Sequence, residues 1–261
     1  MTTRMPVLFI GHGSPLTAFE DNQFTRGWTR LVSGLQPRAV LCISAHWYIR
    51  GSAVTAMPHP RTIHDFYGFP DALYQFHYPA PGDPQLAQRV SELLPSTNIL
   101  HDQQWGFDHG CWAVMKHLVP QANLPVVQLS IDGTHEPQWH YDVGRQLAAL
   151  RDEGVLIIGS GNVVHNLQRI RFTDGAEAFP WATLFDQHVY RCIESFQHQP
   201  LIDYQQADEA LHQAAMLSVP TPEHYLPLLY ALGASNSQDS IQIVLDEVVL
   251  GSVSMLSVKF G

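Results

Sequence analysis

Four short, almost wholly apolar runs constrain the fold of this chain most strongly; they cover residues 6–10, 39–44, 125–131 and 155–159. Strands that are apolar on both faces are typical of a parallel sheet covered by helices on both sides. Helical spacing of apolar residues in 22–35 and 137–151 separates the runs into two β-α-β units. We therefore predict an α/β fold with a mostly parallel central sheet flanked by helices, in which the first two runs form a parallel pair.

The rest of the chain predicts more helices, one long loop and a hairpin. Helices are expected at about 84–94, from Asp108 as N-cap to 118, at 181–196 and from 222. Residues 57–84 mix prolines with aromatic residues, which predicts an irregular loop that forms a wall of a substrate pocket. Two apolar runs split by Gly251, 241–249 and 252–260, predict a C-terminal hairpin. With no repeat and no marked linker, we expect residues 1–261 to form a single catalytic domain.

Charge and cysteine usage argue against several classes of protein. The formal net charge of -10, from 14 basic and 24 acidic residues, makes nucleic acid an unfavourable partner. No apolar run is long enough to cross a membrane, and no charged-then-apolar leader precedes the first strand. Three widely spaced cysteines indicate neither a disulfide framework nor a thiolate zinc site, and we expect Cys111 to be structural. We expect a cytoplasmic protein without a membrane partner.

Four histidines lie where a predicted strand or helix meets a loop: His12, His46, His165 and His224. Neutral imidazole is the commonest protein ligand for zinc and iron, and the carboxyl ends of strands in α/β sheets are where ligands bind. These residues therefore define a candidate site for one divalent metal. Taken singly, His12 and His46 are equally well explained as histidines that hydrogen-bond within a turn or the core.

Residues beside His165 and His224 suggest how these two rings are oriented. Asn162 and Asn166 are placed to orient His165 by hydrogen bonding. His224 follows Thr221 and Pro222, an N-cap and a first helical residue. Its neighbour Glu223 would complete a two-histidine, one-carboxylate iron site, so the pattern leaves open which of the two faces the metal.

Two further histidines are candidates for proton transfer or substrate binding. His109 follows Asp108 and His64 precedes Asp65, and each aspartate could fix the tautomer of its neighbour. A surface role is equally open for His64. Nearby basic residues could bind a substrate carboxylate, although solvated surface charges are the commoner case; they are Arg50, Arg61 and Lys116.

Six motifs in order carry a resemblance to a known family: Gly-His-Gly-Ser-Pro at 11–15, Ser-Ala-His-Trp at 44–47, Ile-His-Asp-Phe at 63–66, Gly-Phe-Asp-His-Gly at 106–110, Ser-Gly-Asn-Val-Val-His-Asn at 160–166 and Pro-Glu-His-Tyr at 222–225. Together they resemble the LigB-type (class III) extradiol ring-cleavage dioxygenases, and more closely the bacterial branch of the 4,5-DOPA extradiol dioxygenases. The likeness extends from the first strand to the last hairpin.

The resemblance implies roles for individual residues. His12 and His46 would be metal ligands, His224 would be the third, and His165 would be an acid/base or a fourth ligand. His109 would line the pocket. Protocatechuate-cleaving relatives supply a glutamate as third ligand, whereas this branch supplies His224. An all-imidazole site suits Zn²⁺ well, so Zn²⁺ is plausible as the bound metal even though Fe²⁺ is expected for dioxygenase activity.

The expected reaction is insertion of O₂ into a catechol, with 4,5-cleavage of DOPA to a muconic semialdehyde. Two alternatives stay open: a zinc-dependent hydrolase that uses His165 or Glu223 as base, and a non-catalytic metal-binding protein on the same fold. The chain lacks the His-Glu-x-x-His helix of many zinc hydrolases. The sequence does not identify the physiological catechol or the oligomeric state.

Overall fold

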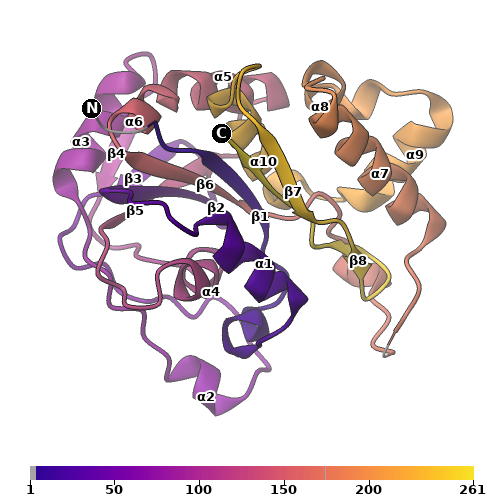
Figure 1. Cartoon of the computed structure of the whole chain (residues 1–261), viewed down its shortest axis with the longest axis horizontal. Coiled ribbons are helices and arrows are strands. Elements are labelled where there is room, and N and C mark those ends of the chain that lie inside the picture. Colours follow the sequence, from indigo (N-terminus) through magenta and orange to yellow (C-terminus); the bar gives the residue numbers. More distant parts are fainter. Residues whose placement is uncertain (1–3, 174) are drawn as a thin grey trace.

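An eight-stranded sheet forms the centre of the structure, a computed structural model that describes residues 4–173 and 175–261 (Figure 1). The strands lie in the order β4-β3-β5-β2-β6-β1-β10-β7. The central four, β5, β2, β6 and β1, are parallel, while β3 and β10 run antiparallel to their neighbours β5 and β1. The strands of this sheet are β1 (Val7–Gly11), β2 (Ala39–Ile49), β3 (Ser52–Thr55), β4 (Ile99–Asp102), β5 (Val126–Asp132), β6 (Val155–Gly161), β7 (Ile241–Leu245) and β10 (Ser257–Phe260).

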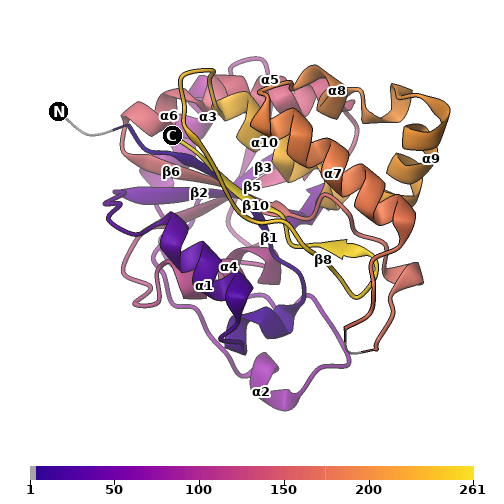
Figure 2. The ribbon, with the colours of Figure 1, turned by 45° about the vertical axis from the view of Figure 1, so that its right-hand side comes forward.

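Helices cover both faces of the sheet. In Figure 1, α1 and α4 lie below it and α3, α5, α6 and α10 above it, while Figure 2 shows α7, α8 and α9 packed together at one side. The α-helices are α1 (Gln23–Leu31), α2 (Asp71–Tyr74), α3 (Pro84–Leu93), α4 (His109–Leu118), α5 (Pro137–Leu147), α6 (Ala149–Asp152), α7 (Pro180–Glu194), α8 (Gln199–Ile202), α9 (Glu209–Ser218) and α10 (Leu226–Ala234). Short 3-10 turns are η1 (Pro15–Phe19), η2 (Leu167–Arg169), η3 (Tyr204–Gln206) and η4 (Pro222–His224). None of the described helices is both long and apolar enough to span a membrane.

Burial on both faces explains the apolar runs. In β1, Val7 and Phe9 pack into the core beneath α5 and α10, whereas Leu8 and Ile10 pack into the core with α1 and α4. Successive residues of a strand point to opposite faces, so a strand covered on both sides must be apolar throughout. The predicted single α/β domain with a mostly parallel sheet is confirmed.

The expected pairing of the first two strands is wrong. β1 and β2 are parallel, but β6 lies between them and pairs with both. The crossover through α5 returns the chain to the middle of the sheet, which pattern alone does not reveal. β2 also continues past Ser44 to Ile49, with a register shift against β5 between Ile43 and Tyr48. His46 lies in this irregular stretch, where a break in the ladder re-aims side chains.

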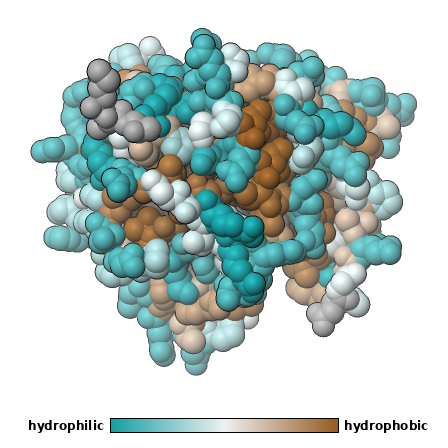
Figure 3. Space-filling view, viewed as in Figure 1, coloured by the Kyte–Doolittle hydropathy of each residue, from teal (hydrophilic) through white to brown (hydrophobic). Residues whose placement is uncertain are grey.

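Several other boundaries differ from expectation. The helix expected at 22–35 ends at Leu31, the one at 137–151 is divided into α5 and α6, and the one expected from 222 begins as the turn η4 before α10. The short strands β3 and β4 and the helix α9 were not predicted. The C-terminal hairpin is confirmed: β7 pairs with β10, and a smaller pair, β8 (Val248–Val249) with β9 (Val253–Ser254), forms its tip. Figure 3 shows hydrophobic residues gathered over β7 at the edge of the sheet.

Helices α5 and α10 cross closely because both carry glycine at the contact. A Cβ atom added to Gly144 would lie 2.3 Å from the Tyr230 carbonyl oxygen, and one added to Gly233 would lie 2.1 Å from the Tyr141 carbonyl oxygen. No rotamer change relieves a clash with backbone, so a side chain here must separate the helices. This crossing holds α10 against β6.

We predict that Gly233→Ala lowers the free energy of unfolding by about 3 kcal/mol, since the methyl group forces the two helices apart. Urea denaturation followed by circular dichroism measures the change. Gln146→Ala, at an exposed position on α5, is the control and should leave the midpoint nearly unchanged. Equal midpoints for Gly233→Ala and the wild type would contradict the close crossing.

Candidate metal centre and active site

His12 and His46 meet at the carboxyl ends of the central strands. His12 directly follows β1, and its backbone N–H donates to the Gly161 carbonyl at the end of β6. His46 reaches the same point from β2. Their Nε2 atoms are 3.2 Å apart. Strands far apart in sequence therefore bring two imidazoles into direct contact.

The partners of the Nδ1 atoms determine where the ring protons lie. The Ser160 hydroxyl donates its only hydrogen to the Gly110 carbonyl at 2.6 Å, so its oxygen accepts the Nδ1–H of His12 at 3.1 Å. Asp65 Oδ2 lies 3.1 Å from His46 Nδ1 and accepts its hydrogen. In a neutral imidazole, a protonated Nδ1 leaves Nε2 with a free lone pair. In their neutral forms the two rings therefore face each other with both Nε2 lone pairs, the form in which imidazole binds a metal.

His224 brings a third imidazole to this point. A Cβ atom added to Gly161 would lie 2.1 Å from the His224 carbonyl oxygen, so only glycine allows η4 to approach β6 this closely. The Asn162 N–H donates to the same carbonyl at 2.8 Å. Ring nitrogens of His12, His46 and His224 all lie within 4.8 Å of one another. Thr221 does not cap the turn with its side chain; its hydroxyl donates to Glu223 instead.

The three imidazoles fit a divalent metal. Burial, followed by the neighbouring imidazoles, lowers the pKa of His12 and of His224 well below the ordinary value for histidine, so both are neutral at pH 7. Glu223 Oε1 lies 3.3 Å from His224 Nδ1, which favours a proton there and a free lone pair on Nε2. A hydrogen-bonded Nδ1 and a bare Nε2 is the usual state of a metal-binding histidine.

His165 lies beside this triad. Its ring stacks on that of His224, with centroids 3.5 Å apart and planes 10° apart. A ring nitrogen of His165 lies in a cluster with Glu223 and His224, not in the cluster of His12, His46 and His224. Burial lowers the pKa of His165 to about 4. The expected contacts with two asparagines are absent: the Asn162 amide donates to the Ser254 carbonyl, and the Asn166 amide donates to the Leu217 carbonyl. Both asparagines hold backbone around the site.

Asp65 links His46 to His109. Its Oδ1 lies 3.1 Å from His109 Nδ1 and accepts the His109 backbone N–H at 2.9 Å, while Oδ2 binds His46. Burial alone would raise the pKa of Asp65, but hydrogen bonds from His109 and His46 outweigh it and hold that pKa well below its usual range. The expected pairing of Asp65 with His64 is wrong, because His64 Nε2 contacts the Phe76 carbonyl.

Asp108 was expected to contact the His109 ring but does not. It holds the first turn of α4 instead. Its carboxylate caps Cys111 N–H, as an N-cap should, and also accepts hydrogen bonds from Ser44 and Gln128. Burial raises the pKa of Asp108. The network joins α4 to β2 and β5 beneath the histidines. Sequence signals identified the cap but not its partners, since Ser44 and Gln128 are distant in the chain.

The proline-rich loop after β3 reaches the histidines. It supplies Asp65 and also Phe66, whose ring meets His109 edge-on with centroids 5.7 Å apart. Two of the basic residues considered as carboxylate binders are engaged elsewhere. Arg61 Nε donates to the Trp105 carbonyl at 3.2 Å, and Lys116 donates to the Ala18 carbonyl.

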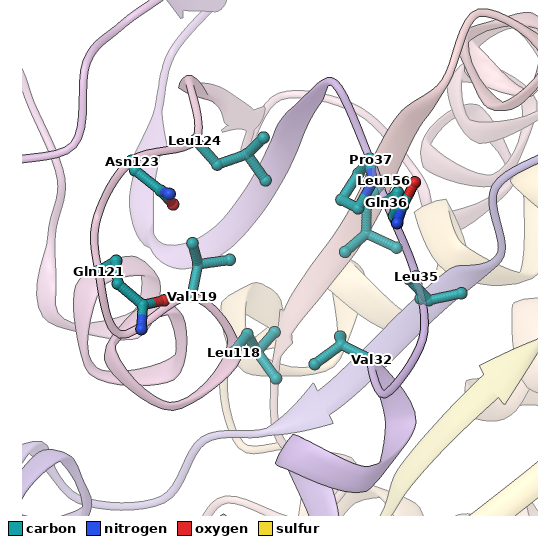
Figure 4. Close-up of a pocket in the computed structure, with 10 residues that line it drawn as sticks. All are labelled: Val32, Leu35, Gln36, Pro37, Leu118, Val119, Gln121, Asn123, Leu124 and Leu156. Atoms are coloured by element: carbon teal, nitrogen blue, oxygen red, sulfur yellow. The ribbon is translucent and has the colours of Figure 1, made fainter.

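A second hollow lies at the opposite end of the sheet (Figure 4). It encloses about 330 Å³ between the ends of α1 and α4 and the starts of β2, β5 and β6. Its lining is apolar with amide side chains at the rim: Val32, Leu35, Leu118 and Leu124 face Gln121 and Asn123. None of its lining residues is titratable, so it offers no acid, base or metal ligand.

We predict that Asp65→Asn weakens metal binding about 10- to 100-fold, because an amide orients and polarises His46 less well than a carboxylate. Titration calorimetry of the metal-free protein with Zn²⁺ measures the change. Asp71→Asn removes the same charge from an exposed position on α2 and should bind Zn²⁺ as the wild type does. An unchanged affinity in Asp65→Asn would show that this carboxylate does not support the site.

Comparison with known proteins identifies the family. Residues 6–260 match the family described as the catalytic LigB subunit of aromatic ring-opening dioxygenase. The chain is 50% identical to 4,5-DOPA dioxygenase extradiol of Escherichia coli K12, covering all of this chain and 96% of that protein. It is 37% identical to the protein of the same name from Beta vulgaris, covering 97% and 95%.

A solved structure shares the fold. It is the crystal structure of an uncharacterized protein from Escherichia coli K12, with a TM-score of 0.85 and 45% sequence identity, covering 99% of this chain and all of the other. The family match spans nearly the whole chain and includes every histidine of the site. This chain belongs to the LigB family of aromatic ring-opening dioxygenases.

Proposed function

We propose that this protein is an extradiol dioxygenase that cleaves the ring of a catechol, with DOPA as the substrate and 4,5-cleavage as the outcome. The observation that carries the proposal is the 3.2 Å approach of the Nε2 atoms of His12 and His46, with His224 beside them. Relatives named 4,5-DOPA dioxygenase extradiol, at 35–50% identity, support the substrate. Family membership favours this activity over a zinc hydrolase or a non-catalytic metal-binding protein.

In the proposed site His12, His46 and His224 hold one divalent metal, Fe²⁺ for activity, with Zn²⁺ as a competing ion for three imidazoles. The bound metal would hold catechol and O₂ together and lower the pKa of the catechol hydroxyls. The protein keeps His12 and His224 neutral and places Ser160 and Asp65 against the Nδ1 atoms of His12 and His46. Free thiols at all three cysteines support the cytoplasm as the proposed compartment.

His165 is proposed as the acid/base. Its nitrogen lies within 4.8 Å of a His224 nitrogen but does not join the triad, which favours this role over that of a fourth ligand. With its pKa lowered to about 4, the ring is neutral at pH 7 and can accept a proton from a catechol hydroxyl. Its stacking on His224 fixes the orientation of the ring.

His109 and Phe66 are proposed to line the substrate pocket. His109 is 5% exposed, and its backbone N–H donates to Asp65 Oδ1 at 2.9 Å, which holds the residue beside the other histidines. Burial lowers the pKa of His109 more than Asp65 raises it, which leaves a neutral ring that hydrogen-bonds without adding charge. Overall, both atoms of O₂ enter the product: one ring C–C bond breaks, and an aldehyde and a carboxylic acid form.

We predict that His165→Ala abolishes O₂ uptake and semialdehyde formation while retaining the metal. The protein is loaded anaerobically with Fe²⁺, DOPA and air are added, and O₂ consumption and the yellow product are recorded. Loss of a positioned base should lower the rate about 10²- to 10⁴-fold. The exposed His59→Ala is the control and should match the wild type. Full activity in His165→Ala would refute its role, and no uptake by iron-loaded wild type with any catechol would refute the proposed function.

The pH profile offers a second test. Because the pKa of His165 lies near 4 rather than 6.5, the base stays neutral as the pH falls below 6.5 and is lost only near 4. We expect the contribution of His165 to kcat/KM of the iron-loaded enzyme to persist as the pH falls to that range. Circular dichroism over the same pH range reports whether the protein remains folded. An acid limb centred at 6.5 would show that His165 is not the base in its buried environment.

A further inference from the structure

Glu223 has hydrogen-bonding capacity that the protein does not use. Its Oε1 accepts the Thr221 hydroxyl at 2.7 Å and lies 3.3 Å from His224 Nδ1. Its Oε2 accepts no hydrogen bond from any described residue. Asp65, the other carboxylate beside the histidines, uses both of its oxygens. One oxygen of Glu223 is therefore free for a ligand.

Glu223 lies on an accessible side of the site. Its carboxylate and ring nitrogens of His165 and His224 lie within 4.8 Å of one another, next to the proposed base. The side chain of Glu223 is 23% exposed, while that of His224 is 9% exposed. Tyr48 is 38% exposed, and its pKa is raised first by burial and then by the nearby charge of Glu223. A substrate that reaches His165 therefore passes close to this carboxylate.

No lysine or arginine among the described residues forms an ion pair with Glu223. Basic groups of the surrounding loops are turned to other partners: Arg61 to the Trp105 carbonyl, Lys116 to the Ala18 carbonyl and the Phe19 ring, and Arg171 to the face of Phe179. A partly buried carboxylate without a cationic partner favours a ligand that brings one.

We propose that Glu223 binds the side-chain ammonium group of the catechol substrate and selects for it. This inference rests on the proposed function and deepens it. DOPA carries an ammonium group on the second carbon from its ring, and a carboxylate on the same carbon. Glu223 offers the ammonium group a charge-assisted hydrogen bond and repels the carboxylate, which carries the same charge. The enzyme therefore selects the amine rather than the acid of its substrate.

The proposal separates three catechols that differ only in these groups: DOPA has both, dopamine has only the amine, and 3-(3,4-dihydroxyphenyl)propionate has only the acid. For the iron-loaded wild type, we expect similar kcat/KM for DOPA and dopamine and a value about 10- to 100-fold lower for the propionate. Glu223→Gln should lower kcat/KM for the first two about 10- to 100-fold more than for the third, so that the three values become similar. Glu194→Gln removes an exposed charge on α7 and should keep the wild-type ratios.

A role limited to orienting His224 makes a different prediction. Glu223→Gln would then lower kcat/KM for all three catechols by the same factor, because the metal site serves every substrate. That result, or equal cleavage of DOPA and the propionate by the wild type, would overturn the proposal.

Binding without turnover keeps the test independent of the proposed reaction. Titration calorimetry of Zn²⁺-loaded protein under nitrogen gives the Kd of each catechol. We expect dopamine and DOPA to bind the wild type about tenfold or more tightly than the propionate, and Glu223→Gln to remove the difference. Selective binding without ring cleavage in the iron-loaded enzyme would refute the dioxygenase but support ammonium recognition. Equal Kd values for the three compounds would overturn ammonium recognition.

Discussion

The site depends on bringing bare imidazole nitrogens together, which is unfavourable unless a cation accepts their lone pairs. Ser160 and Asp65 lie against the Nδ1 atoms of His12 and His46, so in their neutral forms neither ring has a hydrogen to donate across the 3.2 Å between their Nε2 atoms. Protonation would relieve this repulsion, but burial opposes a charged His12. A divalent metal satisfies all of these constraints together.

The sheet supplies the rigidity that such an arrangement requires. β6 lies between β1 and β2, so Gly161 and Ser160 are directly beside His12, while His46 comes from the irregular end of β2. The missing side chain of Gly161 admits the His224 backbone, and the glycine crossing of α5 with α10 holds that segment in place. Side chains at strand ends are held in place more precisely than side chains on loops. Three metal ligands at fixed distances from one another require this precision.

Much of this arrangement could be predicted from the sequence. Continuous apolar runs indicate strands buried on both faces, and a histidine directly after such a run is placed at the ligand-binding edge of the sheet. His12, His46 and His224 converge as that pattern suggested, and His165 lies beside them. The choice between Glu223 and His224 was open from sequence, and the structure groups His224 with His12 and His46.

What the sequence could not predict is mostly long-range pairing. Neighbouring residues suggested that Asp65 serves His64 and that Asp108 serves His109, whereas Asp65 joins His46 to His109 and Asp108 binds Ser44 and Gln128. Strand order failed for the same reason, because nothing local reveals that β6 enters between β1 and β2. Local chemistry identifies which groups need partners, and tertiary structure decides which partners they receive.

A crystal structure of the protein soaked with Zn²⁺, with the ion located by its anomalous signal, would show which residues hold the metal. We predict one ion at about 2.0–2.1 Å from a ring nitrogen of each of His12, His46 and His224, with His165 outside the coordination sphere. An ion held instead by His165, Glu223 and His224, or no ion at this end of the sheet, would contradict it.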